Sequence, residues 1–275
     1  MYDRFRWTRA SVRRNRLTAE YEPLQPFFFA ALCDRAGCRT FVDVGANVGV
    51  YSLFATLMPT VGEVIAFEAD PTTLAALKKN VEINGLEARI RVYGNAVSDS
   101  CGPVMFGTVG ALSGANSVVS TSIHNAGKFR RRYTVEATTL DAVLNDAIEP
   151  PVAMKIDVEG HEAAVLAGAI SILRSNSAVI QVECFGGSAD KIVRLLKPLG
   201  FDQLTAIGTD HYFTNVESCC DATEVIAVYE SASREMIDYA NRAKPLTLQQ
   251  GDFKLEVAGK TAELARKLKR FAGRK

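Results

Sequence analysis

The chain has 275 residues, of which 48% are hydrophobic and 23% charged, as is typical of one large α/β domain. No apolar run approaches the ~18 residues of a membrane span and no secretion signal is visible, so a soluble protein in the cytoplasm is expected. The net charge of +1 combines +5 in residues 1–16, +5 in residues 255–275 and −9 in the acidic body between them.

Short β-branched runs alternate with helical stretches along the chain, a pattern typical of βαβ units around a parallel sheet. This order predicts an α/β fold with a doubly wound, seven-stranded, mostly parallel sheet. Ligands bind such sheets at the carboxyl ends of the strands, near the switch in strand order. Strands are predicted at residues 40–44, 63–68, 89–97, 153–158, 178–184, 201–207 and 223–229.

Helices are predicted between these strands from apolar spacing and from residues that start or stop helices. The clearest follows Asp70 as N-cap and Pro71 as first residue, and it ends at Asn84-Gly85. The other predicted helices are residues 48–58, 163–173 and 191–199.

An insert of about 55 residues separates the third and fourth strands, far more than a usual α/β loop. Residues 98–132 are rich in Gly, Ser, Asn and basic residues, which predicts a surface excursion shaped for a substrate. The remainder is predicted to form a helix from Thr138 to Ile148, with Thr138 and Asp141 spaced like a capping box.

The strongest local motif is Asp43-Val-Gly45-Ala-Asn47-Val-Gly49, which follows the first strand. The two glycines permit a tight strand-to-helix turn, and the start of the helix offers backbone N–H groups to an anion. Dinucleotide sites favour G-x-G-x-x-G, whose middle glycine admits a pyrophosphate. Because that glycine is absent here, the motif favours a ligand without pyrophosphate, such as S-adenosylmethionine.

Two further sequence positions suit the nucleoside part of such a ligand. Glu68, at the end of the second strand, can accept hydrogen bonds from both ribose hydroxyls. Asn95-Ala96, at the end of the third strand, would lie beside the adenine, although an Asn before a turn is equally well explained as a turn former.

A second cluster, Lys155-Ile-Asp157-Val-Glu159-Gly160-His161-Glu162, follows the fourth strand. Ionisable groups at the end of a buried strand carry a desolvation cost that a simple loop does not explain. The cluster therefore predicts the reactive part of the site.

These motifs together resemble the FkbM family of class I methyltransferases. The resemblance is carried by DVGANVGVYS (43–52), AFEADP (66–71), NAVSD (95–99), TTLDAVL (138–144) and MKIDVEGHEAAVLAGA (154–169), and it covers roughly residues 38–185. It implies S-adenosylmethionine as methyl donor and O-methylation of a glycan or natural-product hydroxyl.

The site residues follow from the motifs and the resemblance together. The predicted cofactor-binding residues are Asp43, Gly45, Ala46, Asn47, Gly49, Glu68, Ala69, Asn95, Ala96 and Asp157. The candidates for the general base that strips the acceptor proton are Asp157, Glu159 and His161. Asp157 and Glu183 could also hold a divalent metal, a weaker alternative that leaves the metal dependence open.

The resemblance and the charge pattern suggest three parts of the chain. Residues 1–37 form a basic arm and helix, residues 38–230 the methyltransferase domain with a substrate-side insert at 98–139, and residues 231–275 a helical basic extension. The basic segment 258–275 could dock on a membrane or an acidic partner, or be an ordinary terminal helix. The expected partner is a small-molecule or glycan acceptor.

Four other functions are the alternatives. A short-chain oxidoreductase is disfavoured because no Tyr-x-x-x-Lys occurs, and a nucleic-acid N-methyltransferase because the fourth strand ends in D-V-E-G rather than D/N-P-P. N-methylation of a small molecule, and a binding module without enzymatic activity, are the remaining readings. Arg130-Arg131-Arg132 in the insert is either a solvated charge run or a contact for an anionic acceptor.

Overall fold

The computed structural model describes residues 4–8, 10–12, 22, 24–120, 126–144, 148–219 and 221–242. Within these residues a seven-stranded sheet has the order β10-β11-β9-β8-β1-β2-β3. Neighbouring strands are parallel except β11, which runs antiparallel to both β9 and β10. The strands are β1 Thr40–Val44, β2 Glu63–Phe67, β3 Ile90–Tyr93, β8 Val152–Ile156, β9 Ala178–Glu183, β10 Asp202–Ile207 and β11 Asp210–Thr214. The predicted doubly wound, mostly parallel α/β sheet is confirmed.

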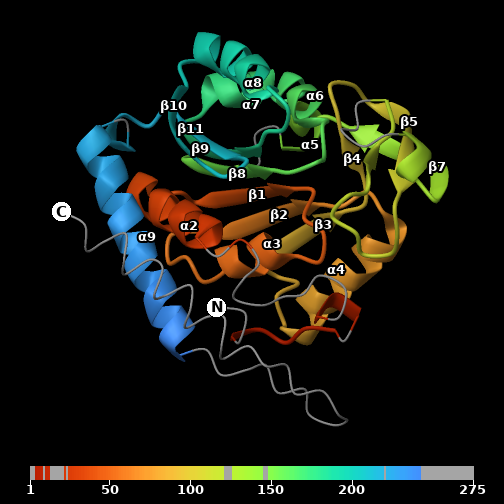
Figure 1. Cartoon of the computed structure of the whole chain (residues 1–275), viewed down its shortest axis with the longest axis horizontal. Coiled ribbons are helices and arrows are strands. Elements are labelled where there is room, and N and C mark those ends of the chain that lie inside the picture. The colour runs from red at the N-terminus through yellow and green to blue at the C-terminus, as the bar shows by residue number, and fades with distance from the viewer. Residues whose placement is uncertain are drawn as a thin grey trace.

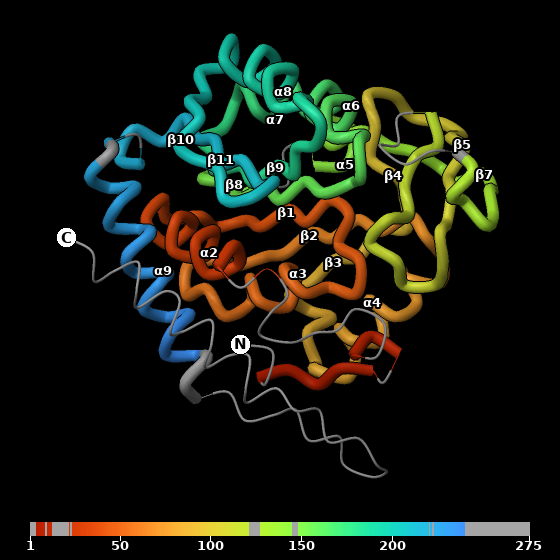
Figure 2. Tube along the Cα trace, viewed as in Figure 1, coloured from red at the N-terminus to blue at the C-terminus, as the bar shows by residue number. Residues whose placement is uncertain are grey.

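Helices cover both faces of this sheet (Figure 1 and Figure 2). One layer holds α2 Gln25–Ala36, α3 Val50–Ala55, α4 Pro71–Ile83 and α9 Ala222–Arg242, and the other holds α5 Leu140–Leu144, α6 Glu162–Ala167, α7 Ile170–Ser175 and α8 Ala189–Leu196. Short 3-10 turns occur at Ala126–Lys128, Lys197–Leu199 and Glu217–Cys219. Successive strand residues alternate between the two layers, so fully buried Phe41 packs in one core and Val42 in the other.

The predicted strand at residues 223–229 is wrong, because this segment is the start of α9. Its β-branched run imitates a strand, but Val228, Ala232 and Met236 are buried at the four-residue spacing of a helix face. The seventh strand is instead β11, which follows the Gly208 turn and buries Tyr212 and Phe213.

The predicted helix at residues 163–173 is two helices, α6 and α7, separated at Gly168-Ala169. A Cβ at Gly168 would lie 2.0 Å from the Ser98 carbonyl oxygen, so the chain approaches its neighbour too closely for a side chain. The Asp141 carboxylate accepts hydrogen bonds from the Ser171 and Ile172 N–H groups, each 3.0 Å long, and thereby caps α7. The predicted Thr138–Asp141 capping box is therefore wrong, and Thr139 caps α5 through the Ala142 N–H.

The insert is more ordered than the predicted surface excursion. It forms a second sheet of order β4-β7-β5-β6, with β4 Ala96–Val97, β5 Gly102–Thr108, β6 Ser117–Val118 and β7 Arg131–Thr138. The single strand predicted at 89–97 is thus wrong, since β3 lies in the main sheet and β4 in the insert. Alternate apolar residues, including Phe106 and Ala137, give the insert a small core of its own.

No helix in the described part of the chain is long and apolar enough to cross a bilayer. The predicted basic helix at residues 258–275 lies outside the described residues. The boundary suggested at residue 231 falls within α9, which packs along α2 through Phe28–Tyr229 and Phe27–Tyr239 ring contacts.

Candidate active site

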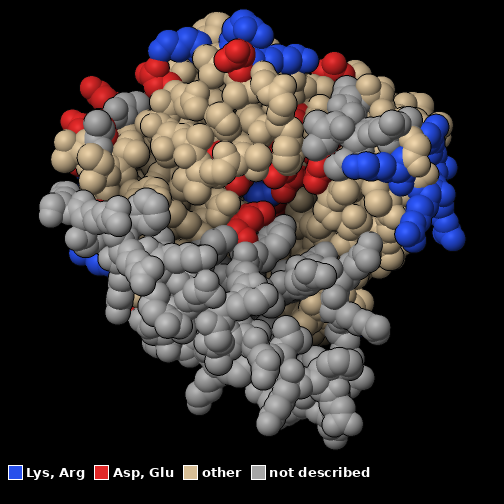
Figure 3. Space-filling model, in the orientation of Figure 1, with Lys and Arg blue, Asp and Glu red and all other residues tan. Residues whose placement is uncertain are grey.

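A cavity of about 330 Å³ opens at the carboxyl ends of β1, β2, β8 and β9, beside the insert. In Figure 3 acidic side chains and one basic group gather in a hollow near the centre of this face. The predicted site residues that line the cavity are Asp43, Gly45, Ala46, Asn47, Glu68, Ala69, Asn95, Ala96, Asp157, Glu159 and His161. Gly49 does not line it.

The turn after β1 is shaped by glycines. Gly45 has φ +80°, and a Cβ there would lie 1.9 Å from the Asp157 carbonyl oxygen. Gly49, with φ +90°, begins α3 and leaves room for Leu77, whose Cδ1 would be 2.5 Å from an added Cβ. Gly49 therefore has a packing role, while Gly45 lets the β1 turn touch the end of β8.

Four backbone N–H groups of this turn are used inside the protein. Those of Gly45 and Ala46 donate to the Phe67 carbonyl, and that of Asn47 donates to Glu68 Oε2 at 2.9 Å. Gly49 N–H donates to the Ala46 carbonyl. These bonds tie the β1 turn to the end of β2, and the use of the start of α3 as an anion site stays a prediction.

Glu68 is held rigidly at the end of β2. Its Oε1 accepts from Asp70 N–H at 2.8 Å, while Oε2 accepts from Asn47. Burial raises the pKa of Glu68 to about 7, against the lowering effect of these two donors. The fixed carboxylate retains acceptor capacity for hydroxyl groups in the cavity.

Asp43 presents a buried polar atom to the same cavity. Its Oδ2 accepts a 2.6 Å hydrogen bond from Ser52, but Oδ1 has no hydrogen-bond partner among the described residues. The residue is 1% exposed, and burial raises its pKa. A buried carboxylate oxygen without a partner is costly, so this atom fits a cationic or N–H-bearing ligand group.

Lys155, whose side chain points from β8, is the buried cation of the site. Its ammonium is 2.8 Å from Asp157 Oδ2 and 4.7 Å from the centre of the Tyr51 ring. The Tyr51 hydroxyl donates to Glu22 and accepts from Gln181. Lys155, Tyr51 and Glu22 all line the cavity. Lys155 belongs to the predicted reactive cluster without a role of its own, and Tyr51 and Glu22 were not among the predicted site residues. Tyr51 belongs to the DVGANVGVYS motif, and this motif is the sequence signal that could have identified it as a site residue.

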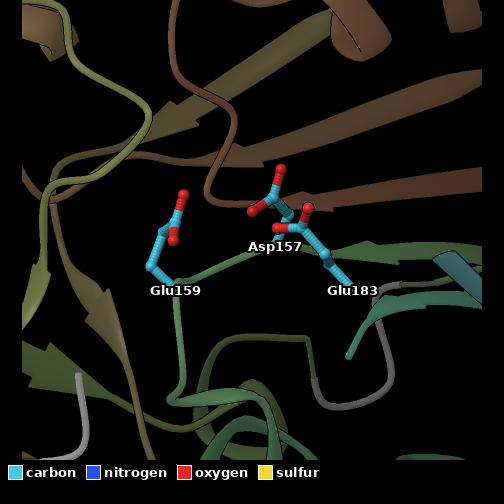
Figure 4. A group of neighbouring side chains, drawn as sticks. All are labelled: Asp157, Glu159 and Glu183. Carbon is cyan, nitrogen blue, oxygen red and sulfur yellow. The ribbon is translucent and has the colours of Figure 1, made fainter. Parts of the chain in front are cut away.

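Three carboxylates from the ends of β8 and β9 converge beside Lys155. One oxygen from each of Asp157, Glu159 and Glu183 lies within 4.8 Å of the other two, and Figure 4 shows the side chains facing a common space. Burial and the Asp157 charge raise the pKa of Glu183 to about 10, so Glu183 is protonated at neutral pH. Burial also opposes ionisation of Asp157, but the Lys155 ammonium and a hydrogen bond from Glu183 together lower the Asp157 pKa.

Glu159 lies in a constrained loop at the edge of this group. Its φ is +57° and that of Gly160 is +108°, and Glu162 Oε1 fixes the loop by accepting from the Val158 and Gly160 N–H groups. Burial, followed by the Asp157 charge, raises the pKa of Glu159 to about 7. A carboxylate with this pKa suits proton transfer near neutral pH.

His161 and Asn95 have partners within the protein. His161 Nε2 is 2.9 Å from Ser98 Oγ, and burial lowers its pKa, so the imidazole is neutral at pH 7. The Asn95 amide donates a 3.4 Å hydrogen bond to the Glu136 carbonyl in β7. Both residues still line the cavity, and the insert closes it with Phe106 and residues 113–118.

Comparison with known proteins gives matches over the same region. Residues 43–202 match the methyltransferase FkbM domain. The chain is 30% identical to the hexuronic acid methyltransferase AglP of Haloferax volcanii, covering 62% of this chain and 67% of the relative. It is 25% identical to methyltransferase sdnD of Sordaria araneosa, covering 58% and 73%.

The solved structures include a methyltransferase FkbM from Methylobacillus flagellatus KT, with 15% identity and a TM-score of 0.46. The match covers 65% of this chain and 44% of that one. The family match extends from the end of β1 to the first residue of β10 and includes the described cavity-lining residues apart from Glu22. This chain therefore belongs to the FkbM family of S-adenosylmethionine-dependent methyltransferases.

Proposed function

We propose that the protein methylates a hydroxyl group of a sugar, with S-adenosylmethionine as the donor. The observation that carries this proposal is Glu159, a cavity-lining carboxylate with a pKa of about 7, placed beyond the Asp43–Glu68 end of the same cavity. Such a group accepts a hydroxyl proton at neutral pH. The name of the hexuronic acid methyltransferase relative supports a sugar as acceptor.

The donor half of the cavity fits S-adenosylmethionine. The buried Asp43 Oδ1 offers an acceptor to the α-ammonium group, and Glu68 offers acceptors to the ribose hydroxyls. Ala69, Asn95 and Ala96 line the adjoining wall, where an adenine would lie. Gly45 lets the β1 turn contact the Asp157 backbone directly.

The other half of the cavity, lined by Lys155, Asp157, Glu159 and Glu183, is the proposed acceptor half. It supplies the base and the charges around the base. S-adenosylmethionine provides an electrophilic methyl group, whose transfer to oxygen is an in-line displacement. Glu159 takes the proton from the acceptor hydroxyl as the oxygen–methyl bond forms. Lys155 holds Asp157 ionised, and protonated Glu183 can donate to Asp157, so Glu159 is the carboxylate left to act as base.

His161 is assigned a positioning role in this proposal. Its hydrogen bond to Ser98 joins the loop after β8 to the start of the insert, and its low pKa makes it a poorer proton acceptor than Glu159. No metal is assigned to the three carboxylates, because the Lys155 ammonium already provides their counter-charge at 2.8 Å from Asp157.

The first test is calorimetric titration of S-adenosylhomocysteine into the protein, with Glu68→Ala as the site variant and Glu63→Ala as the control. Glu63 begins the same strand at its opposite end and is half-exposed. Wild type and control are expected to bind, and Glu68→Ala to bind at least tenfold more weakly. Methyl transfer is then measured with neutral sugars, hexuronates and their amino-sugar counterparts. Failure of the wild type to bind, or transfer only to amines, would contradict the proposal.

A further inference from the structure

A tyrosine of the insert contacts the donor end of the cavity. The Tyr133 hydroxyl, in β7, donates a hydrogen bond to Asp70 Oδ2, in the turn between β2 and α4. The Tyr133 ring packs against Phe106, which lines the cavity from β5. Tyr133 therefore supports a wall of the cavity with its ring and reaches the donor end with its hydroxyl.

Asp70 connects this hydroxyl to Glu68. Its Oδ1 caps α4 by accepting from the N–H and the hydroxyl of Thr73, each at 2.8 Å, and its own N–H donates to Glu68 Oε1 at 2.8 Å. Asp70 and Glu68 are both buried, with 3% and 8% of their surface exposed. Among the described residues, the Tyr133 hydroxyl is the hydrogen-bond partner of Asp70 Oδ2. One side chain thus separates Tyr133 from Glu68.

The charge of Asp70 also acts on Glu68. Burial, followed by the Asp70 and Asp43 carboxylates, raises the pKa of Glu68 to about 7 against the lowering effect of two backbone N–H donors. A hydroxyl that donates to a buried carboxylate disperses part of its charge. Burial and the bond to Asp70 raise the pKa of Tyr133, so its hydroxyl keeps its proton at neutral pH. Tyr133 therefore weakens the repulsion between Asp70 and Glu68.

We propose that Tyr133 is a positioning residue for donor binding, whose hydroxyl holds the Asp70 carboxylate and thereby lets the neighbouring Glu68 accept hydrogen bonds from the ribose. This inference rests on the proposed role of Glu68 at the donor end. Because the same tyrosine packs against Phe106, the insert contributes to donor binding as well as closing the cavity.

The test is calorimetric titration of S-adenosylhomocysteine between pH 5.5 and 8.5 into wild type, Tyr133→Phe and Tyr93→Phe. Tyr133→Phe removes the hydroxyl and retains the ring beside Phe106. The matched control is Tyr93→Phe, at a half-buried position of β3. The Tyr93 ring stacks on Phe67, and its hydroxyl has no hydrogen-bond partner among the described residues.

Tyr133→Phe is expected to bind at least threefold more weakly at pH 7, because Asp70 then repels the ionised Glu68 more strongly and raises its pKa. The pH below which affinity falls should therefore move upward in Tyr133→Phe and stay unchanged in Tyr93→Phe. Asp70→Asn retains an oxygen that can cap α4 but removes the charge, so in that variant the same pH should move downward. Loss of packing at Tyr133 does not predict these opposite shifts.

Unchanged affinity and pH dependence in Tyr133→Phe, or shifts in one direction in both variants, would overturn the inference. Glu68→Ala, titrated alongside, separates the two proposals. If Glu68→Ala binds like wild type, the proposed donor site fails and the inference with it, whereas weak binding by Glu68→Ala beside normal binding by Tyr133→Phe contradicts the inference alone. Circular dichroism shows whether each variant is folded. Should Tyr133→Phe be unfolded, an Asp70→Asn profile that does not move downward overturns the inference.

Discussion

Glu159 occupies a backbone conformation that most residues avoid, with φ +57°, and the loop holds it there beside two other carboxylates. If Glu159 is the base, Glu159→Gln lowers kcat by about 10²- to 10⁴-fold, the usual contribution of a general base. S-adenosylhomocysteine affinity stays unchanged, because the donor residues are untouched. Steady-state kinetics beside calorimetry measures both, and a variant with wild-type kcat would exclude Glu159.

The kcat for methyl transfer should depend on pH in one direction. A base works when deprotonated, and the Glu159 pKa is raised to about 7, so kcat at saturating donor falls as pH drops below about 7. Glu159→Gln should abolish this acidic limb. An acidic limb that persists in the variant and disappears in His161→Gln would assign the base to the imidazole instead.

Glu68 has the same raised pKa but acts on binding rather than on turnover. Its carboxylate is the proposed ribose acceptor, so S-adenosylhomocysteine affinity should fall below pH 7, by up to tenfold per pH unit. Calorimetry between pH 5.5 and 8.5 measures this dependence, with Glu159→Gln as a control that retains it. A pH-independent affinity would contradict the assignment.

Lys155 provides the cation that a metal would otherwise supply. We therefore expect methyl transfer to persist after treatment with EDTA and to drop sharply in Lys155→Met, which leaves Asp157 buried without its counter-charge. Activity that EDTA removes and a divalent ion restores would show that the carboxylates bind a metal.

At the scale of elements, Asp141 joins α5 to α7 within one helix layer. Its two oxygens accept separately from Ser171 and Ile172 at the start of α7. Asp141→Asn retains one acceptor and Asp141→Ala retains none, so stability should decrease in that order, with about 1 kcal/mol lost in the alanine variant. Urea unfolding measures the series, and equal stability of all three proteins would show that the cap contributes nothing.

The sequence predicts the elements that depend on local interactions better than those that depend on contacts between distant residues. The β1 turn, β2 and α4 are encoded locally, by glycines, a buried apolar run and the Asp70 cap, and the structure agrees. The sequence does not predict the strand at 210–214 and wrongly predicts one at 223–229, because packing against β9 and α2, respectively, decides the structure of these segments. The insert sheet likewise depends on pairing between distant strands.

The candidate site likewise combines residues that local motifs predict with residues that only the fold brings together. Asp43, Glu68, Asp157 and Glu159 stand in motifs that follow strands, and the parallel sheet brings them to one edge. Glu22 reaches the cavity from the N-terminal region, so no motif or spacing along the chain places it there. The use of the turn N–H groups within the protein also depends on β2, which the motif alone does not show.

At the scale of the whole molecule, the buried carboxyl groups link stability to pH. Burial raises the pKa of Glu68 and Glu159 to about 7 and of Glu183 to about 10, so the folded state binds more protons than the unfolded state from about pH 4.5 to those values. The free energy of unfolding therefore decreases as pH rises through this window. The lowered pKa values of His161 and His211 act oppositely only below about pH 6.5.

We therefore expect a lower Tm at pH 9 than at pH 6.5, at constant ionic strength. Glu183→Gln should flatten this dependence, whereas Glu149→Gln, at an exposed position, should not. Thermal unfolding followed by circular dichroism at both pH values provides the measurement. A Tm that rises toward pH 9 would show that the buried carboxyls are ionised at little cost.

The contact of Gly45 with the Asp157 carbonyl has a consequence for how such enzymes diversify. Because backbone meets backbone there, no packed side chain sets the spacing between the β1 turn and the end of β8. The insert, by contrast, has its own sheet and its own small core. Insert sequences can therefore be exchanged to recruit new acceptors while the reactive centre keeps one geometry, which makes the scaffold modular.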